Sequence, residues 1–316
     1  MKYLFLTLLT FSLWSCQQPQ KKPTMESKIV IAHRGASGYL PEHTLAAKSM
    51  AYAMHPDYLE QDVVLSKDDV PIVIHDIHLD AVTNVAEVFP ERKREDGRYY
   101  VIDFTFEELK KLNVVERFDF ETGEVVFPKR FPKGASRFGL HSLQEEIELI
   151  QGMNKSTGNN IGIYPEIKDP AFHQKEGKAI SEMVLKILSE YGYTTKNDNC
   201  ILQCFDASEL RRIREALKSE LFLVQLMEFE EEIDAIPQFA VYADGLGPWI
   251  TLLPEGRLMN LAKEHKLKVH AYTLRKDQLE GNQTFEAILE KVLYEYEVDG
   301  VFTDHPDAVI QYIKTR

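Results

Sequence analysis

Residues 28–54 read KIVIAHRGASGYLPEHTLAAKSMAYAM and contain the unit from which the rest of the fold is built. The run 28–32 is apolar and rich in β-branched side chains, which favours a buried strand. A turn containing Gly35 and Gly38 follows, and Thr44 is placed to cap a helix over 44–54. A buried strand that leads through a turn into a helix is the repeating unit of a parallel sheet.

The same alternation continues to the end of the chain. Further strands are predicted at 58–65, 71–74, 161–167, 199–204, 222–226, 242–246, 268–272 and 300–303. Further helices are predicted at 142–153, 175–191, 207–218, 254–265, 284–296 and 307–314. About eight repeats over roughly 300 residues are typical of a closed (β/α)8 TIM barrel, which we predict. The alternative is an open doubly wound sheet, but no strand is followed by the Gly-x-Gly-x-x-Gly turn of its dinucleotide-binding form.

Residues 80–140 interrupt this alternation with prolines, aromatic residues and a mixed-charge run at 91–96. A segment this long with its own aromatic side chains is predicted to form a small inserted subdomain rather than a bare loop. Because it follows the strand at 71–74, we expect it at the C-terminal face of the barrel, beside the mouth of the site. The folded domain is then predicted to cover 27–316, with the insertion at about 80–140.

The composition is that of a folded, acidic protein. Of the 316 residues, 44% are hydrophobic, and 37 Lys and Arg stand against 50 Asp and Glu for a net charge of −13. These values are typical of a chain that forms a core and exclude a mainly disordered one. Since nucleic acid is itself negative, we expect no nucleic-acid partner. The excess of carboxylates suits a site that holds a cation.

The first residues are typical of a targeting segment. Residues 1–15 combine a charged start with an apolar run about half as long as a bilayer span, which predicts a signal peptide. Cys16 resembles the lipidated cysteine of a bacterial lipobox, and residues 16–26 would then form a flexible polar tether. We expect an exported lipoprotein, periplasmic or on the cell surface, anchored to the membrane through Cys16. The alternative is ordinary signal cleavage with an incidental Cys16.

The other two cysteines, Cys200 and Cys204, lie in one predicted strand. Four residues of strand span about 13 Å, which is too far for a disulfide between them. We therefore expect both to be small core residues, and the stability of the exported domain to come from a large core.

Two histidines stand at the ends of predicted strands, where barrel active sites are built. His33 follows the strand at 28–32 with Arg34 beside it, and His75 follows the apolar run at 71–74. Two imidazoles on opposite sides of a phosphorus would deprotonate the attacking oxygen and protonate the leaving one. Arg34 offers a planar donor fork that matches phosphate oxygens. The alternative is a helix-capping loop with a surface arginine and histidines that only pack.

Three acidic side chains complete the pattern. Glu60 and Asp62 share one face of the strand at 58–65, and Glu166 shares a face with Lys168 at the next long strand. Unpaired carboxylates enclosed in a barrel are costly, and a divalent cation removes that cost. Oxygen ligands without a Cys or His cluster indicate Ca²⁺ or Mg²⁺, and export favours Ca²⁺. The alternative is an exposed edge strand with solvated acids.

Together these clusters resemble the glycerophosphodiester phosphodiesterase family. The motifs that carry the resemblance, in the family's order, are His33-Arg34-Gly35, Glu42, Glu60-x-Asp62, His75-Asp76 and Pro165-Glu166-Ile167-Lys168. His43, the segment 89–100 and the stretch Gln203-Cys204-Phe205-Asp206 resemble its periplasmic, calcium-dependent branch. The resemblance covers nearly all of residues 28–316.

The resemblance implies a role for each matched residue. His33 and His75 would be the acid–base pair, and the metal would be held by Glu60, Asp62 and Glu166. The residues implied to bind substrate are Arg34 at the phosphoryl group, Lys168 near it, Glu42 as a support for His33 or the glycerol, and Gln203, Phe205 and Tyr272 in the pocket wall.

The reaction implied is hydrolysis of a small glycerophosphodiester to sn-glycerol 3-phosphate and an alcohol such as choline or ethanolamine. We expect broad tolerance of the alcohol and little activity on intact phospholipids, while the oligomeric state stays open. One alternative is a phospholipase D-like enzyme that uses the same barrel on lipid diesters. Another is a surface lipoprotein that uses the barrel only to bind a ligand, because fold alone does not define function.

Overall fold

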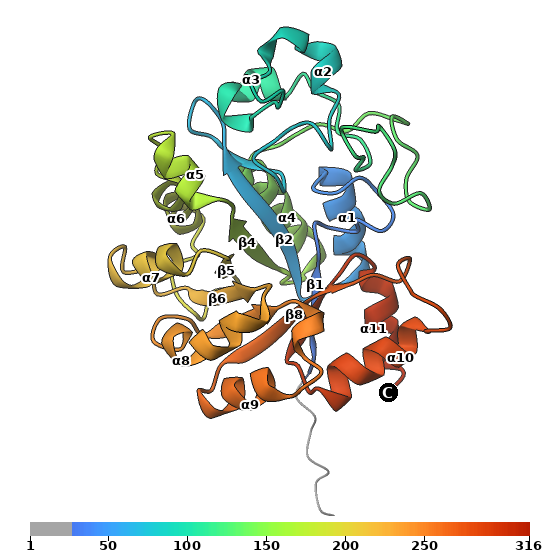
Figure 1. Ribbon diagram of the computed structural model, residues 1–316, viewed down its shortest axis with the longest axis vertical. Helices are drawn as coiled ribbons and strands as arrows, with labels where there is room; N and C mark the ends of the chain where they lie inside the picture. Colours follow the sequence, from blue (N-terminus) through green and yellow to red (C-terminus); the bar gives the residue numbers. More distant parts are fainter. Residues whose placement is uncertain (1–26) are drawn as a thin grey trace, which may run out of the picture.

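The computed structural model describes residues 27–316, in which eight parallel strands close into a barrel. The predicted signal peptide and Cys16 lie outside the described residues. The barrel strands are β1 (Ile29–Ala32), β2 (Tyr58–Leu65), β4 (Gly162–Ile167), β5 (Ile201–Cys204), β6 (Phe222–Met227), β7 (Gly245–Pro248), β8 (Lys268–Leu274) and β9 (Gly300–Thr303). Each pairs in parallel with its neighbours, and β1 closes the ring by pairing with both β2 and β9. The prediction of a TIM barrel is confirmed (Figure 1).

Helices cover the outside of the barrel (Figure 1). They are α1 (Leu45–Met54), α4 (Leu143–Thr157), α5 (Pro170–Lys175), α6 (Ile180–Glu190), α7 (Ala207–Glu215), α8 (Ile236–Phe239), α9 (Arg257–Glu264), α10 (Phe285–Glu290) and α11 (Pro306–Lys314). Side chains cap four of them: Thr44 accepts a bond from Ala47 N–H in the first turn of α1, Asp206 caps α7, Thr284 caps α10, and Ser142 forms a capping box with Glu145 in α4. Such caps satisfy backbone N–H groups that would otherwise lack partners, so they set where each helix begins.

Three predicted elements differ from the structure. The helix predicted at 175–191 begins later, as α6, because Gly177 adopts a φ of 76° and separates it from α5, a short helix that was not predicted. The helix predicted at 284–296 is α-helical only over α10. A wider π-helical turn, Lys291–Glu295, follows it directly. The strand predicted at 242–246 begins later, as β7, because the N–H of Ala243 donates to Phe239 O in a turn that follows α8. No helix was predicted at α8.

Residues 77–140, which we call the insertion, separate β3 (Pro71–Val73) from α4. They contain α2 (Val85–Val88), α3 (Phe106–Leu109) and two 3-10 turns, Pro90–Arg92 and Val101–Asp103. β3 runs antiparallel to β2 and leads the chain back over it. The insertion buries its own apolar cluster, which includes Phe104. The same cluster contains Val64 of β2 and Ile72 of β3. In Figure 1 the insertion lies at the top, beyond the end of β2.

The interior of the barrel is filled by large side chains from several strands. They include Ile31, Tyr164, Ile201, Val224 and Phe302. Tyr164 is fully buried, and its hydroxyl lies 2.9 Å from His270 Nδ1. Because the middle of the barrel is closed in this way, the polar side chains near the strand ends surround a cavity at the C-terminal face, where this fold builds its sites.

Neither cysteine within residues 27–316 forms a disulfide. Cys200 and Cys204 are both free and fully buried, which confirms the prediction that they are core residues. In the same described range, no helix is both long enough and apolar enough to cross a bilayer.

Candidate active site

One cavity at the C-terminal ends of the strands collects almost all of the residues singled out from the sequence. Its volume is about 450 Å³. The predicted residues in its wall are His33, Arg34, Glu60, Asp62, His75, Glu166, Lys168, Gln203, Phe205 and Tyr272. Glu42 lies in the wall of an adjoining cavity that shares His33, Arg34 and His75 with the first. Residues far apart in the sequence are therefore brought together by the closure of the barrel.

Three carboxylates meet at the centre of this cavity. Sheet register places Asp62 of β2 beside Glu166 of β4, and Glu166 beside Gln203 of β5. Glu60, Asp62 and Glu166 are all buried, and each offers an oxygen within 4.8 Å of the others. Gln203 Nε2 donates to Glu60 Oε1 at 3.2 Å. Such spacing of carboxylate oxygens fits a single divalent cation.

The electrostatics of these acids also fit a cation. Burial, with Asp62 beside it, raises the pKa of Glu60 well above its usual range. Burial, again with Asp62 beside it, raises the pKa of Glu166 to about 8. The buried oxygen Oδ1 of Asp62 has no hydrogen-bond partner. A divalent cation would neutralise this crowding and satisfy that oxygen, so the residues present fit a metal.

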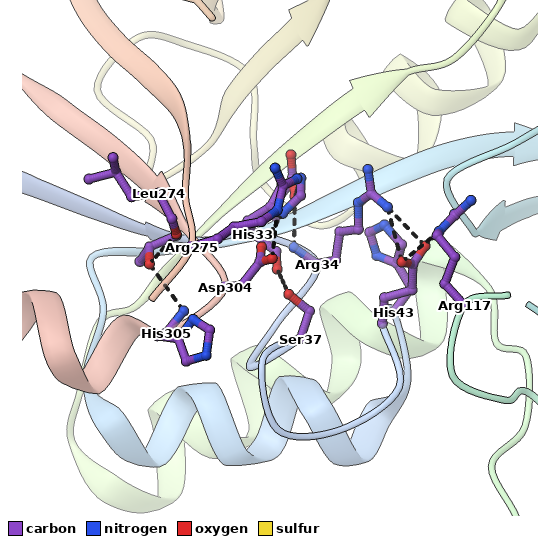
Figure 2. Close-up of polar contacts among 12 residues, drawn as sticks. His33, Arg34, Ser37, His43, Arg117, Leu274, Arg275, Asp304 and His305 are labelled. Carbon is purple, nitrogen blue, oxygen red and sulfur yellow. Dashed lines mark hydrogen bonds and ion pairs between the residues drawn. The ribbon is translucent and has the colours of Figure 1, made fainter. Parts of the chain in front are cut away.

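His33 reaches the cavity from the end of β1. Its Nδ1 lies 2.5 Å from Asp304 Oδ1, and its Nε2 lies 3.8 Å from Glu60 Oε2. An ionised carboxylate only accepts hydrogen bonds, so the ring proton sits on Nδ1 and Nε2 faces the carboxylate cluster. Burial, helped by the Arg34 charge, lowers the pKa of His33 to about 4. Figure 2 shows Asp304 directly beneath the His33 ring.

His75, just beyond β3, repeats this arrangement on another side of the cavity. Its Nδ1 lies 2.6 Å from Asp76 Oδ1, and its Nε2 lies 3.5 Å from Lys168 Nζ. Burial, followed by the Arg34 and Lys168 charges, lowers the pKa of His75 to about 3. Both histidines therefore use Nδ1 for a carboxylate and present Nε2, neutral and able to accept a proton, to the cavity.

Arg34 is held in an uncommon conformation with a φ of 57°. Its backbone N–H donates to Glu60 Oε2 at 2.7 Å, and its Nη1 lies 3.0 Å from both oxygens of Glu42. Glu42 also accepts bonds from Arg117 of the insertion, and Figure 2 shows the two guanidinium groups converging there. Glu42 thus supports Arg34. Of the two roles implied for Glu42, support of His33 is not what the structure shows, because Asp304 holds that ring, and support of the glycerol stays a prediction.

The remaining predicted residues form the opposite wall. Lys168 Nζ lies 2.7 Å from Glu166 Oε1 and 5.7 Å from the centre of the Phe205 ring. The rings of Phe205 and Tyr272 meet edge to face with centroids 5.9 Å apart. The Tyr272 hydroxyl donates to the Met227 carbonyl at 2.9 Å, so the tyrosine offers its ring rather than its hydroxyl to the cavity.

Several residues of the site were not predicted to take part. His43 Nε2 lies 2.7 Å from Asp62 Oδ2, and Arg275 also lines the main cavity. The position of Asp304 could have been recognised from the sequence, because it directly follows β9 and therefore stands at a strand end like His33. No sequence pattern indicates that Arg117 and Arg130 belong to the site, since they lie in the insertion and only the fold brings them to the barrel.

A closed barrel with histidines, arginine, lysine and three carboxylates around one cavity defines a hydrolase suited to a phosphoric diester. Residues 33–308 match the model of the glycerophosphoryl diester phosphodiesterase family. The chain belongs to this family. It is an enzyme, a glycerophosphodiester phosphodiesterase, as the similarity of curated relatives along most of its length also shows. The alternative of a binding module without activity is thereby disfavoured.

Two bacterial relatives match nearly the whole chain. The glycerophosphodiester phosphodiesterase of Haemophilus influenzae is 43% identical, over 91% of this chain and 90% of its own. That of Treponema pallidum is 35% identical, over 90% of this chain and 92% of its own. An Oleispira antarctica phosphodiesterase, solved in complex with the product sn-glycerol-3-phosphate, shares the fold with a TM-score of 0.65 and 22% identity, over 90% of this chain and 96% of that chain.

Proposed function

We propose that the enzyme hydrolyses glycerophosphodiesters to sn-glycerol 3-phosphate and an alcohol, with His33 and His75 as acid and base and with a divalent cation that the three carboxylates would hold. The observation that carries this proposal is that both imidazoles point Nε2 into the cavity that holds the three-carboxylate cluster. The product bound by the Oleispira antarctica relative supports the choice of sn-glycerol 3-phosphate.

Glu60, Asp62 and Glu166 would hold the cation. All their donor atoms are oxygens, which suits the hard ions Ca²⁺ and Mg²⁺, and we propose Ca²⁺ because the chain is expected to be exported. When bound, the ion supplies Lewis-acid polarisation of a phosphoryl oxygen. The raised pKa values of Glu60 and Glu166 imply that cation binding displaces protons from the cluster.

The chain's own side chains stabilise negative charge on the phosphoryl group and transfer the protons of the reaction. Arg34 and Lys168 are half-buried cations on the cavity wall, placed to stabilise negative charge on the phosphoryl oxygens. One imidazole takes the proton of the attacking oxygen at Nε2, and the other returns a proton to the oxygen of the departing alcohol. The bound diester carries a negative charge, which raises the pKa of a nearby imidazole and favours its protonated form. Overall, the elements of water are added across one P–O bond.

The test is release of sn-glycerol 3-phosphate from glycerophosphocholine by the purified enzyme. We expect activity to disappear with EDTA and to return with Ca²⁺, and less fully with Mg²⁺. Sphingomyelin, assayed beside it, separates this function from a phospholipase D-like one. Full activity in EDTA would contradict the metal assignment, and turnover of sphingomyelin alone would contradict the substrate.

A further inference from the structure

Two arginines of the insertion contact the carboxylates that hold the two imidazoles. Arg130 binds Asp304, the partner of His33, and Arg117 binds Asp76, the partner of His75. We infer that Arg117 and Arg130 are positioning residues, through which the insertion holds both imidazoles in the orientation that the reaction needs. This inference rests on the proposed acid–base roles of His33 and His75, and its experiment separates the two.

Arg130 is almost completely enclosed, with 3% of its side chain exposed. Its Nη2 donates to Asp304 Oδ2 at 2.6 Å, while Asp304 Oδ1 holds His33. Its Nε and Nη2 donate to the two oxygens of Asp277, at 2.7 and 3.1 Å. The guanidinium also lies 3.6 Å above the centre of the Phe127 ring. These contacts allow the guanidinium one position, and that position fixes the plane of the Asp304 carboxylate.

Arg117 makes the equivalent connection to the second histidine. Its Nη1 donates to Asp76 Oδ2 at 2.8 Å, and Asp76 Oδ1 holds His75. Its Nε and Nη2 donate to both oxygens of Glu42, at 3.0 and 2.6 Å, and Glu42 in turn binds Arg34. One guanidinium therefore holds the carboxylate behind His75 together with the carboxylate behind Arg34.

Each carboxylate sets two properties of its imidazole. It keeps the proton on Nδ1, which leaves Nε2 for proton transfer, and it sets the rotation of the ring. A carboxylate with a single partner is free to rotate, whereas one held at its second oxygen by a guanidinium is not. Asp304 Oδ2 also accepts from Arg275 Nε at 2.9 Å, so loss of Arg130 leaves a counter-charge and a single N–H···O contact at that oxygen, and it removes the shorter of the two contacts that fix the carboxylate.

The competing explanation is that these arginines only fasten the insertion to the barrel. Arg94 provides the matched control, because it also joins the insertion to the barrel by bidentate ion pairs. It donates to Asp103 within the insertion and to Glu176 at the end of α5, at 2.7 to 3.2 Å, and neither partner contacts a histidine. A fastening role predicts similar effects for Arg94, Arg117 and Arg130.

The experiment compares Arg130→Gln, Arg117→Gln and Arg94→Gln in kcat and KM for glycerophosphocholine at saturating Ca²⁺. We expect kcat to fall about 10²-fold in the first two, with KM little changed, since misplacement of a reacting group by about 1 Å costs this much. The Arg94→Gln control should keep its kcat. Arg130→Lys keeps the charge but loses the paired N–H donors of the guanidinium group. Its kcat should lie between those of wild type and Arg130→Gln.

A double variant tests whether Arg130 acts through Asp304. Asp304→Asn should lower kcat strongly, and adding Arg130→Gln should lower it by no more than about twofold further, because the two residues form one chain of contacts. Thermal unfolding of each variant separates loss of fold from loss of position. Independent, multiplicative effects, or wild-type kcat in folded Arg130→Gln, would overturn the inference. His33→Ala with wild-type turnover would instead overturn the proposed acid–base role.

Discussion

His33 and His75 show how much of this site is decided by single atoms. Each imidazole uses Nδ1 for a carboxylate, Asp304 or Asp76, and each presents Nε2 to the cavity. Burial lowers the pKa of His33 to about 4 and that of His75 to about 3, so both rings are neutral at pH 7 before substrate binds. A neutral Nε2 is a proton acceptor, which suits the base of the proposed reaction.

Removal of either imidazole tests this directly. We expect His33→Ala and His75→Ala each to lower kcat by about 10²–10⁴-fold, the usual contribution of general acid–base catalysis. Circular dichroism and the unfolding temperature should stay close to those of the wild type, because both side chains line a cavity rather than the apolar core. A folded variant with normal turnover would remove that histidine from the chemistry.

Glu116, in the insertion, makes stability depend on pH. It is 3% exposed, its Oε2 lacks a hydrogen-bond partner, and burial raises its pKa to about 7. In the unfolded chain its pKa is about 4.3. Below about pH 4 the residue is protonated in both states and costs nothing. As pH rises from there to about 7, the unfolded state loses its proton first, so stability falls.

Glu116→Gln should therefore stabilise the protein at pH 8 and have little effect at pH 4. The expected gain at pH 8 is at most about 4 kcal/mol, from the difference between the two pKa values. Denaturant unfolding of wild type and variant at the two pH values measures it. An equal difference in stability at both would contradict a raised pKa for this carboxyl group.

At the scale of elements, β2 is the strand on which the site depends. Its alternation sends Glu60 and Asp62 into the cavity and Gln61 outward, where Gln61 Nε2 donates to Glu146 of α4 at 2.8 Å. Glu146 also pairs with Lys48 of α1 at 2.9 Å, and both side chains are fully buried. Lys48 Nζ in turn donates to the Glu60 carbonyl. A buried ion pair between two helices thus holds the backbone that carries two of the carboxylates.

Breaking this pair should destabilise the whole domain. Glu146→Gln leaves Lys48 charged and buried, which typically costs about 3–5 kcal/mol. The double variant Lys48→Met/Glu146→Gln should recover part of that loss, because no isolated charge remains. Free energies of unfolding from denaturant titration give both values. If the double variant were no more stable than Glu146→Gln alone, the pair would not act as a charge pair.

Most elements could be predicted from periodicity, and the exceptions have local causes. The strand at β2 and the capped helix α4 follow strong patterns of alternation and capping. The break between α5 and α6 depends on Gly177, whose positive φ a helical pattern does not reveal. The insertion itself was predicted, but the short helices within it were not, because they bury their apolar side chains in one cluster with β2 and β3 and show no regular period.

At the scale of the whole molecule, one end of the barrel carries the cavity and the other end receives the start of the described chain. The cavity lies at the C-terminal ends of the strands, while Ser27 leads into the start of β1 at the other end. Figure 1 shows the insertion and the entry of the chain at opposite ends of the molecule. We propose that a lipid on Cys16 anchors the protein to the membrane, and the described chain then enters the barrel at the end opposite the cavity.

Substitution of Cys16 tests this arrangement. In the native host, Cys16→Ser should move the protein from the membrane fraction to the soluble fraction and remove the mass of the attached lipid. Its kcat on glycerophosphocholine should equal that of the wild type, since all the residues that line the cavity belong to the described part of the chain, from His33 onward. Persistence of Cys16→Ser in the membrane fraction, with unchanged mass, would contradict lipidation.

The sequence by itself determined the repeated strand–helix units, the family, and the residues that stand at strand ends, because these depend on local periodicity and on motifs of a few residues. Only the tertiary structure decided that Asp304 is the partner of His33, that Glu42 belongs to Arg34, and that the insertion delivers Arg117 and Arg130 to the site. These pairings join residues separated by up to 271 positions. Barrel closure and the docking of the insertion create them, and no local pattern records which distant strand ends will meet.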